Sequence, residues 1–273
     1  QCRVGIVNCD DSNCEKILKS HTCDVITYGF SSEADYMAYD TRLYNENGRL
    51  SVGFDVKNKN DDSMFKYKTP TPGRFSVYNS LAAIVLCKYF GVDESTIEKA
   101  LGKASTKGRM EVVEINKDYT LLIDYAHNAM SLRSLLETLK EYEHGRLICL
   151  FGCGGNRSRL RRLEMGQVSG ELADLTIITS DNPRFEEPQA IIEDIKSGLL
   201  PTGGEFVEIC DRIEAIEYGM SIAGRGDILI LAGKGHEDYQ EIRGKKYPMD
   251  ERDIIRDILK KEGTDGQICQ CDN

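Results

Sequence analysis

The second half of the chain alternates short apolar runs with longer amphipathic segments. The pattern predicts strands at 121–123, 147–151, 175–179, 206–210 and 228–231, and helices at 130–142, 160–172, 189–199, 212–222 and 251–261. Strands that alternate with helices through short links are typical of βαβ units. We therefore expect an α/β fold here, with an open, mostly parallel, Rossmann-like sheet covered by helices.

The first hundred residues follow a different pattern. Apolar and alternating runs predict five strands, at 4–8, 25–28, 36–39, 50–56 and 64–67. The last three alternate with period two between breaks rich in Asn, Gly and Asp, which predicts a small antiparallel sheet. Three helices are expected, one through Ile17 and Leu18, one from Val77 to near Gly91, and one from Asp93, its N-cap, to Leu101.

A domain boundary is expected between Gly102 and Gly108, where Lys, Ser and Thr interrupt the apolar pattern. This boundary divides the chain into residues 1–106 and 107–273. The sequence starts without Met and inside an expected strand, so we also expect that a segment precedes Gln1.

Composition narrows the classes of function. The chain is 40% hydrophobic and 29% charged, as in ordinary globular proteins, and its net charge of -10 argues against binding to nucleic acids or membrane surfaces. No apolar run approaches the ~20 residues that span a bilayer, so membrane insertion is not expected. Ten cysteines without a signal peptide predict reduced thiols in the cytoplasm.

No metal site is expected from the sequence pattern. Cys269 and Cys271 form a C-x-C pair near the end of the chain, but no second pair accompanies them. Structural zinc sites need four ligands, so this spacing argues against one.

Four of the expected strands are followed by unusual polar groups. These groups are Asp124-Tyr125-Ala126-His127-Asn128, Gly152-Cys153-Gly154-Gly155-Asn156-Arg157, Asp181-Asn182-Pro183-Arg184 and Gly233-Lys234-Gly235-His236-Glu237. In an open α/β sheet such strand ends face one crevice. Glycine turns allow backbone N–H groups to approach an anion there, and lysine or arginine adds positive charge.

The tetrad Asp181-Asn182-Pro183-Arg184 places a carboxylate, an amide and a guanidinium together. A fork-shaped arginine beside an aspartate suits a ligand that carries both a carboxylate and an ammonium group. The tetrad therefore predicts a site for an amino acid.

Each group also has a purely structural interpretation. Gly152 to Gly155 can form a tight turn, Asp124 can cap the following helix, and His127 can be a structural histidine. Glu186 and Glu187 are explained more simply by the positive end of the next helix than by catalysis. The arginines of 157–162 can form a solvated helix face, of which we retain only Arg157 as functional.

The four motifs resemble, in order and spacing, those of the Mur ligases of peptidoglycan synthesis, and most closely those of the member that adds the third amino acid. Two further segments are similar to the family. Gly108-Arg109-Met110-Glu111 resembles the hinge into its C-terminal domain, and Tyr78-Asn79-Ser80-Leu81-Ala82-Ala83 resembles a helix that closes its central ATPase domain. The similarity covers essentially the whole chain.

The resemblance implies an ATP-dependent amide ligase that uses Mg²⁺, UDP-MurNAc-L-Ala-D-Glu and an amino acid. Residues 1–106 would be the C-terminal part of the central α/β ATPase domain, and residues 107–273 the Rossmann-like C-terminal domain. The family's amino-acid site corresponds to Arg157, Asp181, Asn182, Pro183, Arg184, Gly233 and Glu237. Residues near ATP correspond to Asn79, Arg109, Asp124 and His127.

The chain also departs from the family pattern. Asn128-Ala129 replaces the usual Thr-Pro, and Asn156 and residues 158–162 replace the usual loop of lysines and glycine. The sequence contains no Gly-x-x-Gly-Lys-Thr/Ser phosphate loop. In the family this loop, the metal-binding residues and a carbamylated lysine lie upstream of the position of Gln1, so we expect the chain to be inactive alone, lacking the N-terminal domains of its own protein.

Two choices remain open at this stage. The acceptor amino acid can be lysine or meso-diaminopimelate, and we favour diaminopimelate because Arg184 can bind its additional carboxylate and would repel the ammonium of lysine. The protein can also be another ligase of the superfamily, such as a folylpolyglutamate or cyanophycin synthetase, or a non-catalytic protein that binds an amino acid or nucleotide.

Overall fold

The computed structural model describes residues 2–19 and 21–263, which form two compact units. The first unit comprises the described residues within 1–44 and 50–105, and the second comprises those within 45–49 and from 106 onward. The Cys269–Cys271 pair lies outside the described residues. Within those residues, no helix combines the length and apolar character that a bilayer-spanning segment needs.

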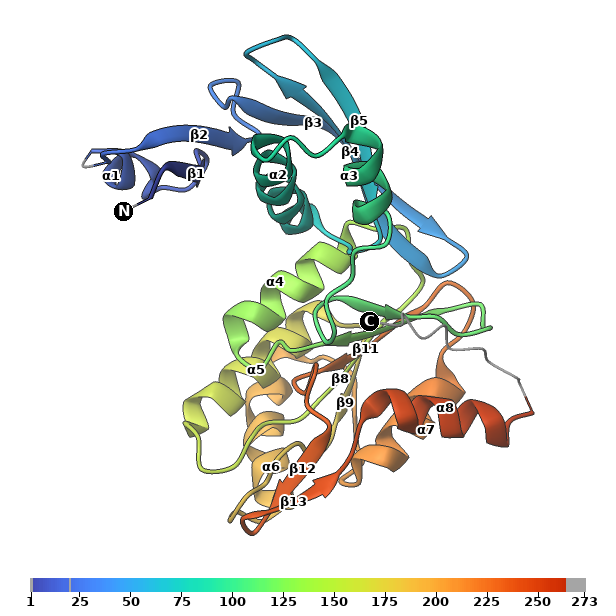
Figure 1. The fold of residues 1–273 in the computed structure, drawn as a ribbon. Helices are drawn as coiled ribbons and strands as arrows, with labels where there is room; N and C mark the ends of the chain where they lie inside the picture. Colours follow the sequence, from blue (N-terminus) through green and yellow to red (C-terminus); the bar gives the residue numbers. More distant parts are fainter. Residues whose placement is uncertain (1, 20, 264–273) are drawn as a thin grey trace. The chain divides into compact units, whose positions relative to one another are not determined.

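The first unit is built on a five-stranded sheet in the order β1-β2-β3-β4-β5 (Figure 1). Its elements are β1 (Val4–Asn8), α1 (Cys14–Leu18), β2 (Asp24–Gly29), β3 (Tyr36–Glu46), β4 (Arg49–Asn58), β5 (Met64–Thr69), α2 (Arg74–Tyr89) and α3 (Glu94–Leu101). The expected strands and helices are present, and Asp93 caps α3 by accepting a hydrogen bond from Thr96 N.

The expectation of a separate antiparallel sheet is wrong. β4 and β5 are antiparallel, but β3 also pairs in parallel with β2, and β2 with β1, so all five strands form one mixed sheet. Val52, Phe54 and Val56 of β4 pack against Val77 and Leu81 of α2 in the core. These alternate β4 residues share one face, which packs against α2. Such a period-two pattern identifies a strand, but it does not show which strands pair with it or in which direction.

The second unit contains a six-stranded sheet in the order β10-β9-β8-β11-β7-β6. Its strands are β6 (Glu111–Val113), β7 (Thr120–Asp124), β8 (Leu147–Phe151), β9 (Leu175–Ile178), β10 (Phe206–Glu208) and β11 (Ile228–Ala232). Every pair except β6–β7 is parallel. The predicted open, mostly parallel α/β sheet is therefore confirmed.

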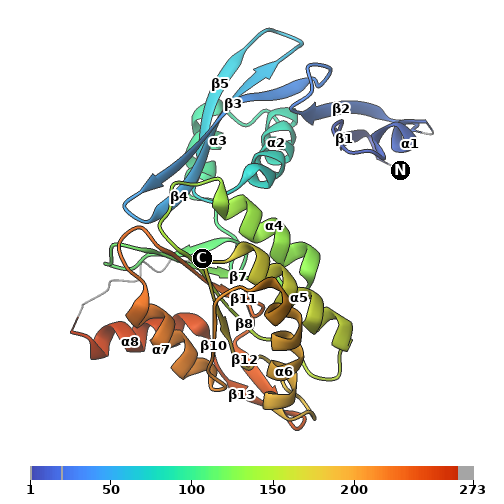
Figure 2. The same cartoon turned by 180° about the vertical axis from the view of Figure 1, so that it is seen from behind.

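Helices cover both faces of this sheet. They are α4 (Ala129–Lys140), α5 (Arg159–Leu172), α6 (Pro188–Leu199), α7 (Arg212–Ile222) and α8 (Glu251–Lys261), with a 3-10 turn, η1, at Leu200–Thr202. Figure 1 shows α7 and α8 on one side of β8 and β9, and Figure 2 shows α4, α5 and α6 on the other. All residues of β8 and β11 are buried, as expected for strands that are covered on two faces.

The sequence pattern missed three strands of this unit. β6 forms an antiparallel edge, and β12 (Tyr239–Ile242) and β13 (Lys245–Pro248) form a separate hairpin. The residues of β13 are all exposed, so the hairpin has no apolar periodicity that could predict it.

Candidate functional site

A cavity of about 220 Å³ lies at the carboxyl edge of the second unit's sheet, between the loops that follow β7, β8, β9 and β11. Seven of the residues predicted from the sequence line it, namely His127, Arg157, Asp181, Asn182, Arg184, Gly233 and Glu237. The structure therefore brings the four strand-end motifs together, as the position of ligands in open α/β sheets led us to expect.

Four predicted residues do not line this cavity. Pro183 and Asp124 are buried, and Arg109 packs over the ring of Tyr125, which does line the cavity. Asn79 is an exposed residue of α2 in the first unit.

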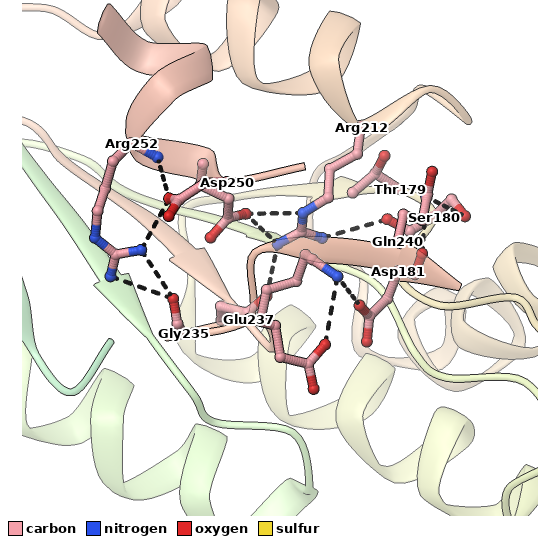
Figure 3. Close-up of polar contacts among 12 residues, drawn as sticks. Thr179, Ser180, Asp181, Arg212, Gly235, Glu237, Gln240, Asp250 and Arg252 are labelled. Atoms are coloured by element: carbon pink, nitrogen blue, oxygen red, sulfur yellow. Dashed lines mark hydrogen bonds and ion pairs between the residues drawn. The ribbon is translucent and has the colours of Figure 1, made fainter. Parts of the chain in front are cut away.

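The floor of the cavity contains a buried ammonium group. Lys234 is completely buried, and its Nζ lies 3.3 Å from Asp181 Oδ1, 3.3 Å from Asn182 Oδ1 and 3.4 Å from Glu237 Oε2. Figure 3 shows Asp181 and Glu237 converging from two different loops. The expectation that a lysine in this glycine-rich turn would face a negatively charged ligand is therefore wrong, because Lys234 neutralises carboxylates of the protein.

Arg184 is held by the β12–β13 hairpin. Its Nε donates to Glu241 Oε2 at 3.1 Å and its Nη1 donates to the Gly155 carbonyl at 2.7 Å, while no described residue accepts from Nη2. Its backbone N–H also donates to the Glu241 carbonyl at 3.0 Å. The hairpin therefore fixes the guanidinium at the cavity wall, and sequence reasoning identified neither Glu241 nor the hairpin as part of the site.

Arg162 also lines the cavity, and its ion pairs correct two expectations. Arg162 is 1% exposed and donates from Nη2 to Glu186 Oε1 at 2.8 Å and from Nη1 to Asp194 Oδ2 at 3.0 Å, so it does not belong to a solvated helix face. Glu186 also accepts from the N–H of Asn156, and so does more than interact with the positive end of α6. Hydrogen bonds from Arg162 and Asn156 lower the pKa of Glu186.

The glycine-rich turn after β8 is required by the loop beside it. A Cβ on Gly155 would lie 1.9 Å from the Pro183 carbonyl oxygen, and the Gly155 N–H donates to the Asn182 carbonyl at 2.8 Å. The turn interpretation is therefore confirmed, and the same turn lines the cavity, while its role in ligand binding stays a prediction.

Three rings and one guanidinium group lie close together beside the cavity. The ring of Tyr125 lies 4.7 Å from that of His127 and 5.0 Å from that of His236, and the Arg109 guanidinium lies 4.8 Å from its centroid. His127 is exposed and its Nδ1 lies 2.8 Å from the Tyr125 carbonyl, so it is not a buried structural histidine. Sequence reasoning did not single out His236 or Tyr125.

Asp124 does not cap α4. Its carboxylate accepts from the N–H groups of Met110 and Ala126 at 2.7 Å each, and Asn128 caps the helix by accepting from Ser131 N. Burial raises the pKa of Asp124, and these N–H donors oppose that effect. Asp124 therefore ties the segment around Met110 to the end of β7.

A buried ion pair lies next to the carboxyl ends of β9 and β11. Arg212 and Glu251 have fully buried side chains, and Arg212 Nη2 lies 2.7 Å from Glu251 Oε1. Arg212 also donates to the carbonyls of Ala232 at 3.0 Å and Ser180 at 3.4 Å. Figure 3 shows Arg212 beside Ser180. One guanidinium thus links the loops that follow β9 and β11.

Comparison with known proteins agrees with this geometry. Residues 1–87 match the Mur ligase middle domain, and residues 108–235 match the Mur ligase domain described as the glutamate ligase domain. The chain belongs to the Mur ligase family.

Similar Mur ligases include two diaminopimelate ligases, each named UDP-N-acetylmuramoyl-L-alanyl-D-glutamate–2,6-diaminopimelate ligase. The protein of Caldanaerobacter subterraneus subsp. tengcongensis is 42% identical over 94% of this chain and 52% of its own length. The protein of Aquifex aeolicus is 37% identical over 97% of this chain and 53% of its own length. This chain therefore spans about half the length of the curated relatives that it matches.

A solved structure of a Mur ligase with the same name aligns with a TM-score of 0.70 and 32% sequence identity. The alignment covers 96% of this chain and 54% of the solved chain. It confirms the Mur ligase fold for these α/β units.

The residues of this Mur ligase chain fit a nucleotide better than a metal ion. Arg109, Tyr125 and His127 form an exposed cationic and aromatic surface, which suits an anionic nucleotide. Within residues 2–19 and 21–263, no group of three or more His, Cys, Asp or Glu side chains is arranged to hold a metal ion.

Proposed function

We propose that this chain carries the amino-acid site of an ATP-dependent ligase that adds meso-diaminopimelate to UDP-MurNAc-L-Ala-D-Glu in peptidoglycan synthesis. The observation that carries the proposal is that one cavity is lined both by the arginines Arg157 and Arg184 and by the carboxylates Asp181 and Glu237. An amino acid with an additional carboxylate presents the complementary charges. The names of the two similar ligases support the same substrate.

In this proposal Arg184 binds the distal carboxylate of diaminopimelate through its remaining Nη2 donor, and Arg157 binds a second anionic group. Among the described residues, no carboxylate pairs with Arg157, which is exposed at the cavity. Asp181 and Glu237 receive an ammonium group, and Asn182, Pro183 and Gly233 shape the floor and the wall. Lysine lacks the distal carboxylate and so leaves Arg184 without a partner.

We assign residues 1–106 to the C-terminal part of the central ATPase domain and residues 107–273 to the C-terminal domain. The family matches at 1–87 and 108–235 support this assignment. In this assignment Arg109, Asp124 and His127 lie on the nucleotide side of the second unit, and Asn79 is the candidate nucleotide-binding residue of α2 in the first unit. The main residues for ATP and Mg²⁺ then belong to the region upstream of Gln1.

The proposed reaction joins an amine to an activated carboxylate. The peptide carboxylate becomes an acyl phosphate, the amino nitrogen attacks its carbonyl carbon, a C–N bond forms, and the bond to the phosphate oxygen breaks as the nitrogen loses a proton. The side chains of this chain hold the amino acid in position for that attack, and positioning alone contributes a large part of such rate accelerations. We place the reaction in the cytoplasm, which is consistent with the free thiols of all described cysteines.

Two measurements test the proposal. Calorimetry on the 273-residue chain should detect binding of meso-diaminopimelate, with L-lysine binding at least about tenfold more weakly because one charged contact is lost. Equal binding of the two amino acids, or a preference for glutamate, would instead support another ligase of the superfamily.

Activity separates an enzyme from a binding protein. The chain alone should not ligate diaminopimelate in the presence of ATP and Mg²⁺, and the chain joined to its own upstream region should do so. An upstream region without a phosphate loop, together with no activity, would identify a non-catalytic binding protein, whereas turnover by the 273-residue chain alone would disprove the assignment of the ATP site.

A further inference from the structure

We propose that Lys234 is a positioning residue for the amino-acid site, and that its buried ammonium makes the cavity floor a receptor for a single ammonium group of the substrate. The inference rests on the proposed function, because it presupposes that the cavity binds an amino acid. It assigns a positioning role to Lys234, which does not itself line the cavity. Its three acceptors, Asp181, Asn182 and Glu237, all line the cavity.

The geometry around Lys234 fixes each of these acceptors. One Nζ atom lies within 3.4 Å of an oxygen from each of the three side chains, and an ammonium group has three N–H donors for them. Asn182 Nδ2 donates to Glu237 Oε2 at 2.8 Å, and Asn182 Oδ1 also accepts from Glu241 N at 2.9 Å. Asn182 is therefore held in one orientation, and two separate loops are joined at one buried atom.

The formal charges explain why such a group is needed. Asp181 and Glu237 carry two negative charges and Lys234 carries one positive charge, so the cluster has a net charge of -1 at neutral pH. Asp181 is buried and the Glu237 side chain is only 18% exposed, so without a cation this pair would be destabilised by repulsion and partial loss of solvation. With Lys234 in place, both carboxylates remain at the floor, and one negative charge is left for a ligand.

The cluster therefore matches a substrate that presents one ammonium to the floor while its reacting amine is directed elsewhere. Removal of Lys234 should move Asp181 and Glu237 apart and release the amide of Asn182. The contacts with the substrate ammonium should then be lost, whereas contacts of Arg157 and Arg184 with carboxylates should be kept. This difference separates a positioning role from a general role in stability.

Calorimetry with two ligands tests the inference on the 273-residue chain. meso-Diaminopimelate carries two carboxylates and two ammonium groups, and pimelate is the same carbon chain without the ammonium groups. In the wild type, diaminopimelate should bind more tightly than pimelate. In Lys234→Met, diaminopimelate affinity should fall at least about tenfold, the loss expected for one charged hydrogen bond, while pimelate affinity should stay within about twofold.

A matched control is Lys196→Met. Lys196 pairs with Glu208 at 2.7 Å in the same unit, away from the cavity, so this variant should bind both ligands as the wild type does. An unchanged preference for diaminopimelate in Lys234→Met would overturn the inference, and so would an equal loss of both ligands, which would mean that Lys234 only supports the fold. A wild type without any preference would instead refute the proposed amino-acid site, and the inference with it.

A measurement without mutation covers the case in which Lys234→Met does not fold. Lys234 is the one buried lysine among the described residues, so its ammonium should give the ¹⁵Nζ signal that is best protected from exchange with water. That signal should shift when diaminopimelate is added and should not shift with pimelate. A protected signal that does not shift when diaminopimelate is added would show that the Lys234 ammonium is not coupled to the amino-acid site.

Discussion

Nε of Arg184 lies 3.1 Å from Oε2 of Glu241, and this ion pair joins a cavity loop to the β12–β13 hairpin. Backbone contacts strengthen the connection, since Arg184 N donates to the Glu241 carbonyl at 3.0 Å and Arg243 N donates to the Arg184 carbonyl at 2.6 Å. Arg184 has a positive φ of 53°, a conformation that such contacts help to maintain. The guanidinium is thus held in place before any ligand binds, which reduces the entropy lost on binding.

We predict that Arg184→Ala lowers kcat/KM for meso-diaminopimelate by about ten- to a hundred-fold in the enzyme that includes the upstream region. A charged hydrogen bond of roughly 1.5–3 kcal/mol accounts for this range. Lysine should be affected far less, because it has no distal carboxylate. Steady-state kinetics with both amino acids measure the difference, and an equal loss for the two would mean that Arg184 is structural.

Arg243→Ala is the control for that experiment. Arg243 belongs to the same hairpin, but its side chain is exposed and pairs only loosely with Glu187, at 3.5 Å. Surface pairs of this kind contribute little, so kcat/KM should remain within about twofold of the wild-type value.

We predict that Glu186 stabilises the folded chain at neutral pH and that this contribution is lost in acid. Its folded-state pKa lies below the ordinary value of 4.5 because of Arg162 and Asn156, so its contribution is present above about pH 4.5 and is lost as the pH falls through the lowered pKa. Glu186→Gln should therefore be less stable than the wild type at pH 7, and this difference should shrink as the pH falls below about 4.5 and through the lowered pKa of Glu186. Urea denaturation at each pH, followed by circular dichroism, measures it.

The neighbouring Glu187 provides a matched control. Its side chain is 79% exposed at the N-cap of α6, so Glu187→Gln should differ from the wild type much less than Glu186→Gln does across the whole range. A Glu186→Gln variant whose stability differs from the wild type by the same amount at every pH would contradict the assigned role of the Arg162 pair.

We predict that Gly155→Ala destabilises the second unit by about 1–3 kcal/mol, the usual cost of overpacking. The added methyl group would meet the Pro183 carbonyl at 1.9 Å, so the loops after β8 and β9 would have to separate. Diaminopimelate binding should weaken in parallel. Gly224→Ala is the control, since its nearest neighbour is 3.8 Å away, and a similar loss in both variants would argue against the close loop contact.

We predict that Arg212→Met lowers the free energy of unfolding by about 3–5 kcal/mol, because it leaves the Glu251 carboxylate buried without its partner. Arg133→Met should change it by less than about 1 kcal/mol, because Arg133 and Glu171 form a partly exposed pair. Urea denaturation compares the two variants directly. Similar values would show that burial does not control the strength of these ion pairs.

The sequence predicted best the elements that are covered on both faces. Continuous apolar runs identified β8 and β11, and polar groups at strand ends identified the loops that line the cavity. In both cases the physical cause is local, since a buried parallel strand must be apolar along its length and ligand-binding groups gather at its carboxyl end.

Long-range pairing decided what could not be predicted. Arg162 lies in a run of arginines and Lys234 lies between glycines, so both suggested exposed cations, yet each is buried and paired with carboxylates from other elements. Those partners are 24 to 53 residues away along the chain, except for Glu237. Hydrophobic periodicity is judged over a short stretch of sequence, so it cannot identify an ion pair between residues this far apart.

The position of β11 between β8 and β7 has a consequence for synthesis on the ribosome. β7 and β8 are synthesised more than seventy residues before Ile228, the first residue of β11. Neither strand can pair with β11 until that part of the chain has been made. Until then two apolar strands have open edges, which are prone to pair with other chains. A nascent chain that stalls before Ile228 therefore lacks the centre of its sheet, and such truncated products should be targets for chaperones or proteolysis.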